Sequence, residues 1–320
     1  MATGAATGRV AMSEAIGQEA GLLQRLSDEL AGAVEQAGRS IVRVNARRRL
    51  PATGVVWSGD GLILTANHVV ERDEEITVTT HDGRDLAAKL VGRDPGSDLA
   101  ALKVEESGLT PAQRVPGEEV RVGGLVLALG RAGTLSATVG IVSAIDGPWE
   151  GGRGRRFARL IGADAPMLPG FSGGPLVDAR GRVVGVLSSH LGRGQTIAVP
   201  ADDVDRIAGS LQSHGRVRRG YLGVGAQPVA LSGALKEAQG LSQESGLLLV
   251  TVEDDGPAAK SGLILGDILV SVGGQPVQSL DDLRQNLGPD RVGQATPARI
   301  LRGGQAQDVT ITIGEQPAQS

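Results

Sequence analysis

Between residues 40 and 200 the hydrophobic positions come in short runs rich in valine, isoleucine and leucine, and turn residues separate the runs. A run such as LILTA at 62–66 has the length and the aliphatic character of a strand. Many strands at this spacing predict a mainly β barrel or sandwich, and the stretch is long enough for two small barrels. The expected strands are 40–44, 53–57, 62–66, 76–80, 86–91, 99–104, 125–130, 137–145, 174–178, 183–189 and 196–200.

A helical pattern precedes the strands at residues 13–37, and a second one follows them at 201–215. In the first, aliphatic residues recur at steps of three, four and seven positions, and Gly38 suits the helix end. About three heptads are short for an autonomous coiled coil, so we expect the stripe to dock on its own domain or on a partner subunit. The stripe consists of Ile16, Leu23, Leu26, Leu30 and Val34.

After residue 216 the pattern changes again, to strands at 247–252, 268–272, 298–302 and 308–313 together with two short helices. Pro257 opens the first helix, and Ser279 caps the second with Asp282 three residues later, close to a capping box. This arrangement predicts a small α+β domain. We therefore divide the chain into a tail with an amphipathic helix (1–38), a β-barrel domain (39–215), an α+β domain (216–315) and a flexible tail (316–320).

Composition narrows the function classes. The 320 residues carry a net charge of −4, which argues against a nucleic-acid binder. The chain has no cysteine, so disulfides, thiolate zinc sites and cysteine nucleophiles are excluded, and the four histidines never fall at a close metal-ligand spacing. We expect no metal and no cofactor. No apolar run reaches about 18 residues and no export signal is recognised, so the chain as numbered is expected in the cytoplasm, or in the periplasm or outside the cell if a signal was removed.

The segment GFSGGPL at 170–176 carries the clearest chemistry, because glycines enclose the serine at position 172. Such a turn brings backbone N–H groups close to a substrate. A nucleophilic serine also needs a base, and the base needs an acceptor that orients it. His68 ends one expected strand and Asp98 precedes another, in the chain order His, Asp, Ser. The alternatives are a simple turn, a buried structural histidine, and Asp94 in place of Asp98, although Asp-Pro more often starts a turn.

Three motifs resemble those of the HtrA (Deg) serine proteases: TANHVV (65–70), DPGSDLAAL (94–102) and GADAPMLPGFSGGPL (162–176). The resemblance implies a chymotrypsin-like double β-barrel protease domain followed by a PDZ domain. It also implies that Ser172 is the nucleophile, that His68 is the general base and that Asp98 fixes the imidazole. The N–H groups of Gly170 and Ser172, with that of Phe171, would form the oxyanion hole. The implied function is an ATP-independent serine endopeptidase that degrades unfolded or misfolded proteins.

The chain departs from this family at Phe171, where the family usually has asparagine. The lost side-chain hydrogen bonding leaves open how the active-site turn is held, and a resting state that needs activation is one reading. The expected substrate pocket holds no carboxylate, which favours small or medium aliphatic substrate side chains. A loop at 151–159 with four arginines is either solvated or, as the family's sensor loop, couples the carboxyl-terminal domain to the catalytic turn. The pocket residues expected are Pro166, Met167, Leu168, Ser188, Ser189 and His190.

The carboxyl-terminal domain resembles a bacterial PDZ domain, which implies that it binds peptide C-termini beside a loop of backbone N–H groups. The simpler alternative is that this loop only begins a core strand. The partners implied are unfolded proteins or peptides and peptide C-termini, and a homo-oligomer is left open, trimer included. The second candidate function is a peptide-binding or chaperone protein whose protease domain is catalytically poor. The residues assigned to peptide binding are Tyr221, Leu222, Gly223, Val224, Leu283 and Leu287.

Overall fold

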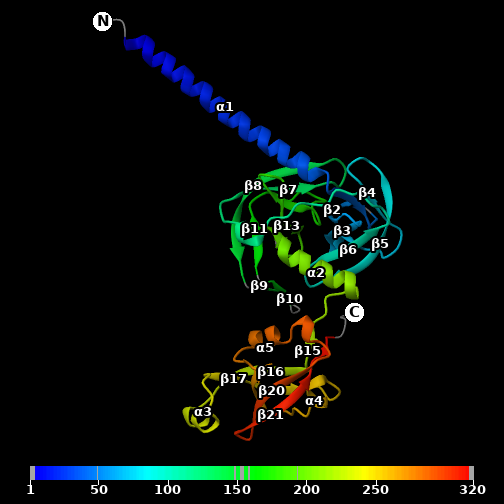
Figure 1. The fold of residues 1–320 in the computed structure, drawn as a ribbon, viewed down its shortest axis with the longest axis vertical. Coiled ribbons are helices and arrows are strands. Elements are labelled where there is room, and N and C mark those ends of the chain that lie inside the picture. Colours follow the sequence, from blue (N-terminus) through cyan, green and yellow to red (C-terminus); the bar gives the residue numbers. More distant parts are fainter. Residues whose placement is uncertain are drawn as a thin grey trace. The chain divides into compact units, whose positions relative to one another are not determined.

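The computed structural model divides the chain into two compact units, Met1–Arg216 and Val217–Ser320 (Figure 1). Each unit is described by itself. Side chains at 1–20, 49, 146, 148–158, 193 and 317–320 are not described, so the predicted role of the arginines at 153–156 lies outside the described residues. The backbone is described for residues 4–48, 50–147, 149–151, 155–157, 159–192 and 194–316.

The first barrel closes six antiparallel strands in the order β1-β2-β3-β6-β5-β4. Its interior is aliphatic, as the strand pattern predicts, with Val42, Ile63 and Leu102 among its buried residues. The strands are β1 (Ile41–Asn45), β2 (Ala52–Ser58), β3 (Leu62–Ala66), β4 (Ile76–Thr79), β5 (Asp85–Asp94) and β6 (Leu99–Val104).

The second barrel closes another six strands in the order β11-β14-β13-β12-β7-β8, which confirms the double-barrel chymotrypsin fold. The sequence pattern missed β11, because its four residues directly precede the glycine- and proline-rich catalytic segment. The strands are β7 (Leu125–Gly130), β8 (Ser136–Asp146), β11 (Leu160–Ala163), β12 (Pro175–Asp178), β13 (Val183–Ser188) and β14 (Thr196–Pro200), and β9 (Trp149–Gly151) pairs separately with β10 (Arg155–Phe157).

Helix α2 (Ala201–His214) joins the two barrels, because it contacts β5 and β6 of the first and β13 and β14 of the second. Its apolar face buries Val204, Ile207 and Leu211, and it ends at Gly215 in a left-handed conformation. Burying this face against both barrels fixes the strand ends that meet between them.

Helix α1 (Gly4–Gly38) begins nine residues earlier than predicted, because alanine and methionine at its start favour a helix. It packs on the second barrel near β7 through Ala33 and Ala37, both buried. Within the predicted stripe, Leu23 and Leu26 are exposed, Leu30 and Val34 are half-buried, and Ile16 lies outside the described side chains. Arg131, just after β7, donates to the carbonyl oxygen of Gly38 at 3.0 Å and so supports the helix end. Among the described residues, no helix combines the length and apolar character needed to span a membrane.

The second unit is built on a sheet with the order β16-β17-β18-β20-β21, which leaves β16 at one edge. Helix α5 (Leu280–Asn286) packs against β16 and begins with the capping box that the sequence predicts at Ser279 and Asp282. Three α-helices occur in this unit rather than two, because α3, capped by Ser232, was not recognised. The elements are β15 (Gly220–Tyr221), β16 (Val224–Ala230), α3 (Gly233–Gln239), β17 (Ser245–Val252), α4 (Pro257–Lys260), β18 (Ile268–Val272), β19 (Gln275–Pro276), β20 (Ala295–Arg302), β21 (Gln305–Thr312) and β22 (Gly314–Glu315).

Candidate active site

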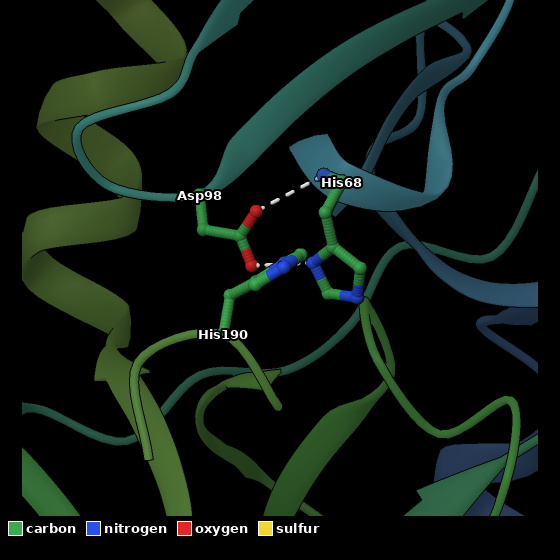
Figure 2. Close-up of side chains that lie close together, drawn as sticks. All are labelled: His68, Asp98 and His190. Carbon is green, nitrogen blue, oxygen red and sulfur yellow. Dashed lines mark hydrogen bonds and ion pairs between the residues drawn. The ribbon is translucent and has the colours of Figure 1, made fainter. Parts of the chain in front are cut away.

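His68 lies in a single 3-10 turn, Asn67–Val69, that follows β3 directly, and Asp98 lies just before β6. One Asp98 oxygen, Oδ1, accepts the backbone N–H of His68 at 3.0 Å, while Oδ2 lies 2.8 Å from the ring nitrogen Nδ1 (Figure 2). Because Nδ1 faces the carboxylate, it carries the ring proton, and Nε2 is left to accept one. Asp98 therefore fixes both the backbone and the ring of the histidine.

The end of β13 supports Asp98 from the other barrel. Ser188 donates its hydroxyl proton to Asp98 Oδ2 and accepts the N–H of Leu191 at 3.3 Å. Only 4% of the Asp98 side chain is exposed, and each of its carboxylate oxygens has a hydrogen-bond donor. Asp94 acts differently, since its carboxylate accepts the N–H groups of Gly96 and Ser97 and closes its own turn.

The turn that carries Ser172 crosses from the second barrel to lie against the first. Gly173 has φ +84°, and a Cβ there would lie 2.3 Å from the carbonyl oxygen of Thr53 in β2, so only glycine fits. Thr53 in turn donates its hydroxyl proton to the carbonyl oxygen of Gly170 at 2.7 Å. The side chain of Phe171, 3% exposed, fills the core of the second barrel. Contacts with both barrels thus hold the turn, and buried apolar surface replaces the missing asparagine.

A fourth side chain, that of Ser189, connects the other three. The Ser172 hydroxyl donates to Ser189 Oγ at 3.0 Å, and Ser189 Oγ lies 3.3 Å from His68 Nε2. Since Nε2 is the acceptor, protons along this chain of hydrogen bonds point from Ser172 to Ser189 and on to His68. Sequence reasoning placed Ser189 only in the substrate pocket, because its position between Ser172 and His68 depends on how the two barrels meet.

The N–H groups around Ser172 are unequally available. Phe171 N–H donates to the carbonyl oxygen of Leu168 at 3.1 Å, so in this conformation it is occupied. Within the described part of the chain, the N–H groups of Gly170 and Ser172 have no hydrogen-bond acceptor. Of the three N–H groups predicted to form the oxyanion hole, the two at Gly170 and Ser172 therefore stay available as donors.

Comparison with known proteins agrees with this geometry. Residues 52–186 match the family described as a trypsin-like peptidase domain, and residues 220–313 match the PDZ domain family. A solved serine endoprotease from Yersinia pestis is 31% identical, with a TM-score of 0.74, and the alignment covers 90% of this chain and 98% of that one. The HtrA-type protease AlgW, solved with a tripeptide, is 32% identical with a TM-score of 0.74, covering 91% of this chain and 98% of that one.

This chain belongs to the HtrA family of serine proteases. A curated HtrA relative, the probable periplasmic serine endoprotease DegP-like of Pseudomonas putida (strain W619), is 39% identical over 277 residues. The corresponding protein of Halomonas elongata is 38% identical over 282 residues. The alignments cover 83% and 84% of this chain but 56% and 57% of those proteins, so the chain spans little more than half the length of these relatives.

The residues predicted to line the substrate pocket of this HtrA chain fall into two groups. Pro166 and Leu168 are exposed, and Met167 packs partly on the core of the second barrel. At the end of β13, the hydroxyls of Ser188 and Ser189 are used inside the site, as described above. The pocket itself stays a prediction.

His190 is exposed and lies beside the general-base candidate. Its ring meets the His68 ring edge to face, with centroids 4.0 Å apart and an angle of 88° between the planes. Figure 2 shows the His190 ring next to both the Asp98 carboxylate and the His68 imidazole. Sequence spacing could not bring these three residues together, because they come from three separate segments.

In the PDZ unit of this HtrA chain, the first residues predicted to bind peptide lie in β15 and in the loop that follows it. Gly223 has φ +73°, and Leu222 is buried with its carbonyl oxygen accepting the N–H of Ala258. Tyr221 donates its hydroxyl proton to the Glu253 carboxylate, and this bond raises the pKa of the tyrosine. Strand β16 then begins at the sheet edge, while the predicted wall residues on α5 and just after it are buried in the core. Those residues are Leu283 and Leu287.

Proposed function

We propose that the chain is an ATP-independent serine endopeptidase that degrades unfolded or misfolded protein. The observation that supports this most is the chain of hydrogen bonds from Ser172 through Ser189 to His68 and Asp98. Ser172 Oγ attacks the scissile carbonyl carbon, while its proton moves to Ser189 and the Ser189 proton moves to His68 Nε2. His68 then protonates the leaving amine as the C–N bond breaks. Water, activated by the same histidine, hydrolyses the acyl-enzyme ester and frees Ser172.

The remaining groups of the site fit this chemistry. The N–H groups of Gly170 and Ser172 would stabilise the oxyanion, and each such donor is typically worth about 10²–10³ in rate. Asp98 stabilises the imidazolium that forms. In the substrate pocket we propose a preference for small or medium aliphatic side chains, since Met167 and Leu168 offer apolar surface and the serines nearby are neutral.

A fluorophosphonate probe and casein degradation test the proposal together. We expect Ser172 to be labelled and casein to be cleaved, with both signals lost in Ser172→Ala. Ser213→Ala, which changes an exposed serine on α2, is the matched control and keeps both. Labelling that persists in Ser172→Ala would reject Ser172 as nucleophile.

One observation favours the second candidate, a binding or chaperone protein with poor catalysis. The Phe171 N–H, one of the three donors that the resemblance assigns to the oxyanion hole, is bonded inside its own turn to the carbonyl oxygen of Leu168. Labelling that stays absent with every peptide added would favour this candidate. Labelling that rises when a peptide binds would instead favour a protease that is activated.

For the PDZ unit we propose binding of peptide C-termini, with the peptide added as a strand beside β16. Support comes from the free edge of that strand, the left-handed Gly223 and the solved AlgW protease, which carries a decapeptide in one structure. Peptides with apolar C-terminal residues should bind to full-length Ser172→Ala in fluorescence anisotropy. The same peptides with an amidated C-terminus should bind far more weakly, because the loop N–H groups lose the carboxylate.

We also propose that the protein acts outside the cytoplasm, since the curated relatives are named as periplasmic. Among the three locations weighed from the sequence, this favours the periplasm over the cytoplasm and the outside of the cell. Cell fractionation of the native host with an antibody against the chain tests it, and recovery with cytoplasmic markers would contradict it.

A further inference from the structure

We propose that His68, Asp98 and His190 form a binding site for a zinc ion, and that zinc bound there reversibly inhibits the protease. One ligand atom from each residue lies within 4.8 Å of the other two. Two imidazole nitrogens and one carboxylate oxygen are a donor set that zinc accepts in proteins, with a fourth position left for water. Magnesium and calcium prefer oxygen donors alone, so they fit this group poorly.

The distances require only a small rearrangement. For tetrahedral zinc with bonds of about 2.0–2.1 Å, neighbouring ligand atoms lie about 3.3 Å apart. Closing the group from 4.8 Å therefore asks for a movement of about 1.5 Å at most. His190 can supply it, because its side chain is exposed just beyond the end of β13, whereas Asp98 is held by three hydrogen bonds.

The surroundings of His68, Asp98 and His190 favour zinc binding in two ways, through support of a ligand and through access from solvent. Asp98 offers a carboxylate oxygen beside two imidazole rings, and Ser188 donates to that carboxylate in the way that outer partners orient metal ligands. His68 is 14% exposed at its side chain, and the exposed His190 ring packs against its ring. An ion can thus reach both imidazoles from solvent.

Inhibition follows from the nitrogen of His68 that binds the ion. Asp98 faces Nδ1, with Oδ2 2.8 Å away, so an ion shared with Asp98 binds at Nδ1. Zinc there replaces the proton shared with Asp98, and the ring proton moves to Nε2. Nε2 can then no longer act as a base. Binding itself does not depend on the proposed protease function, while the inhibition does.

Zinc binding is measured first on full-length Ser172→Ala, which cannot digest itself, by titration calorimetry in a non-coordinating buffer. We expect one zinc ion per chain, with affinity about 10-fold or more weaker once His190→Ala is added. His81→Ala, which removes an exposed histidine in the turn after β4, is the matched control and should leave binding unchanged. Equal binding with and without His190, binding lost in the His81 control, or no binding at about 100 µM zinc would each overturn the site.

Inhibition is measured on the active chain as the rate of fluorophosphonate labelling, relative to the metal-free rate of each variant. Zinc should suppress labelling at the concentration at which it binds, EDTA should restore it, and magnesium at the same concentration should have no effect. His190→Ala should shift the inhibitory concentration by the same factor as the affinity. If zinc binds through His190 but labelling continues, the inhibition is refuted. If labelling is absent even without metal, the proposed protease function fails while the zinc site stands on calorimetry.

Discussion

Replacing Phe171 by asparagine tests whether burial holds the active-site turn. Asparagine is the residue that the HtrA family usually has at this position. From the family pattern alone, Phe171→Asn would therefore be expected to leave the protein unharmed or to improve it. The structure predicts the opposite. The Phe171 ring lies among Val126, Ala128 and Leu176 in the core of the second barrel, and it comes so close to Gly130 that a Cβ there would lie 2.2 Å from Cδ1.

The expected loss of stability has two parts. Truncating a buried phenylalanine typically costs about 3–5 kcal/mol, and an amide left without partners in an apolar core adds about 1–3 kcal/mol. Phe171→Asn should therefore lower the free energy of unfolding of the first unit by about 4–8 kcal/mol. Phe171→Leu keeps the site apolar and should lower it by about 1–2 kcal/mol, so it separates loss of volume from burial of an amide.

Urea unfolding in the Ser172→Ala background measures both variants without self-digestion. The two tryptophans of the chain, Trp57 and Trp149, both lie in the first unit, so their fluorescence reports that unit and not the PDZ unit. Buried Trp57 makes the signal sensitive to loss of the barrels. A Phe171→Asn protein within about 1 kcal/mol of its parent would refute the reasoning, because such a result needs a polar partner that the core does not offer.

Three further predictions concern single side chains. Thr53→Val keeps the shape of a fully buried residue but removes the hydroxyl that donates to the carbonyl oxygen of Gly170. Urea unfolding should show a free energy of unfolding lower by about 2–4 kcal/mol, and fluorophosphonate labelling should slow. Unchanged stability would reject this role of the hydroxyl. Ser189→Ala breaks the hydrogen-bond chain and should slow fluorophosphonate labelling by about 10–100-fold, whereas an unchanged rate would mean direct transfer to the base. Burial raises the pKa of Asp267, but its ion pair with Arg302 outweighs burial and holds that pKa below the ordinary value. The stabilisation from this ion pair is complete above an ordinary aspartate pKa of about 4, and it is lost as the pH falls through the lower pKa of the folded state. In Asp267→Asn, the free energy of unfolding of the PDZ unit should therefore fall less steeply as the pH is lowered. An equally steep fall would count against a stabilising role of the pair.

Local sequence patterns predicted most of the fold, because strand propensity and helix capping depend on residues that are close together in the chain. The run LILTA at 62–66 became β3 at those bounds, and Ser279 with Asp282 became a complete capping box. Where the sequence misled, the competing cause was also local. Strand β11 is four residues long and adjoins a turn-rich motif, and α3 has no buried residue to give it a periodic apolar face.

The residues of the candidate site could be predicted from the sequence, but several of the contacts between them could not. Motifs placed His68, Asp98 and Ser172 in the chain, and the structure brings them into one hydrogen-bonded group. The bridging hydroxyl of Ser189 and the nearness of His190 could not be predicted, because both depend on how one barrel is set against the other. Nor could the role of Phe171, since its burial follows from the path of the turn and not from its neighbours in sequence.

The end of β13 brings these unpredicted contacts together in three consecutive residues. Ser188 donates to Asp98, Ser189 lies between Ser172 and His68, and His190 meets the His68 ring. A single slip of β13 against β14 would move every one of these side chains to another face, because strand side chains alternate. Gly185 opposes such a slip, since a Cβ at this position would lie 2.4 Å from the carbonyl oxygen of Val199 and only glycine lets the two strands approach so closely. The register of one strand pair therefore sets the proton path and the proposed zinc site at the same time, so a change that loosens β13 should weaken both together.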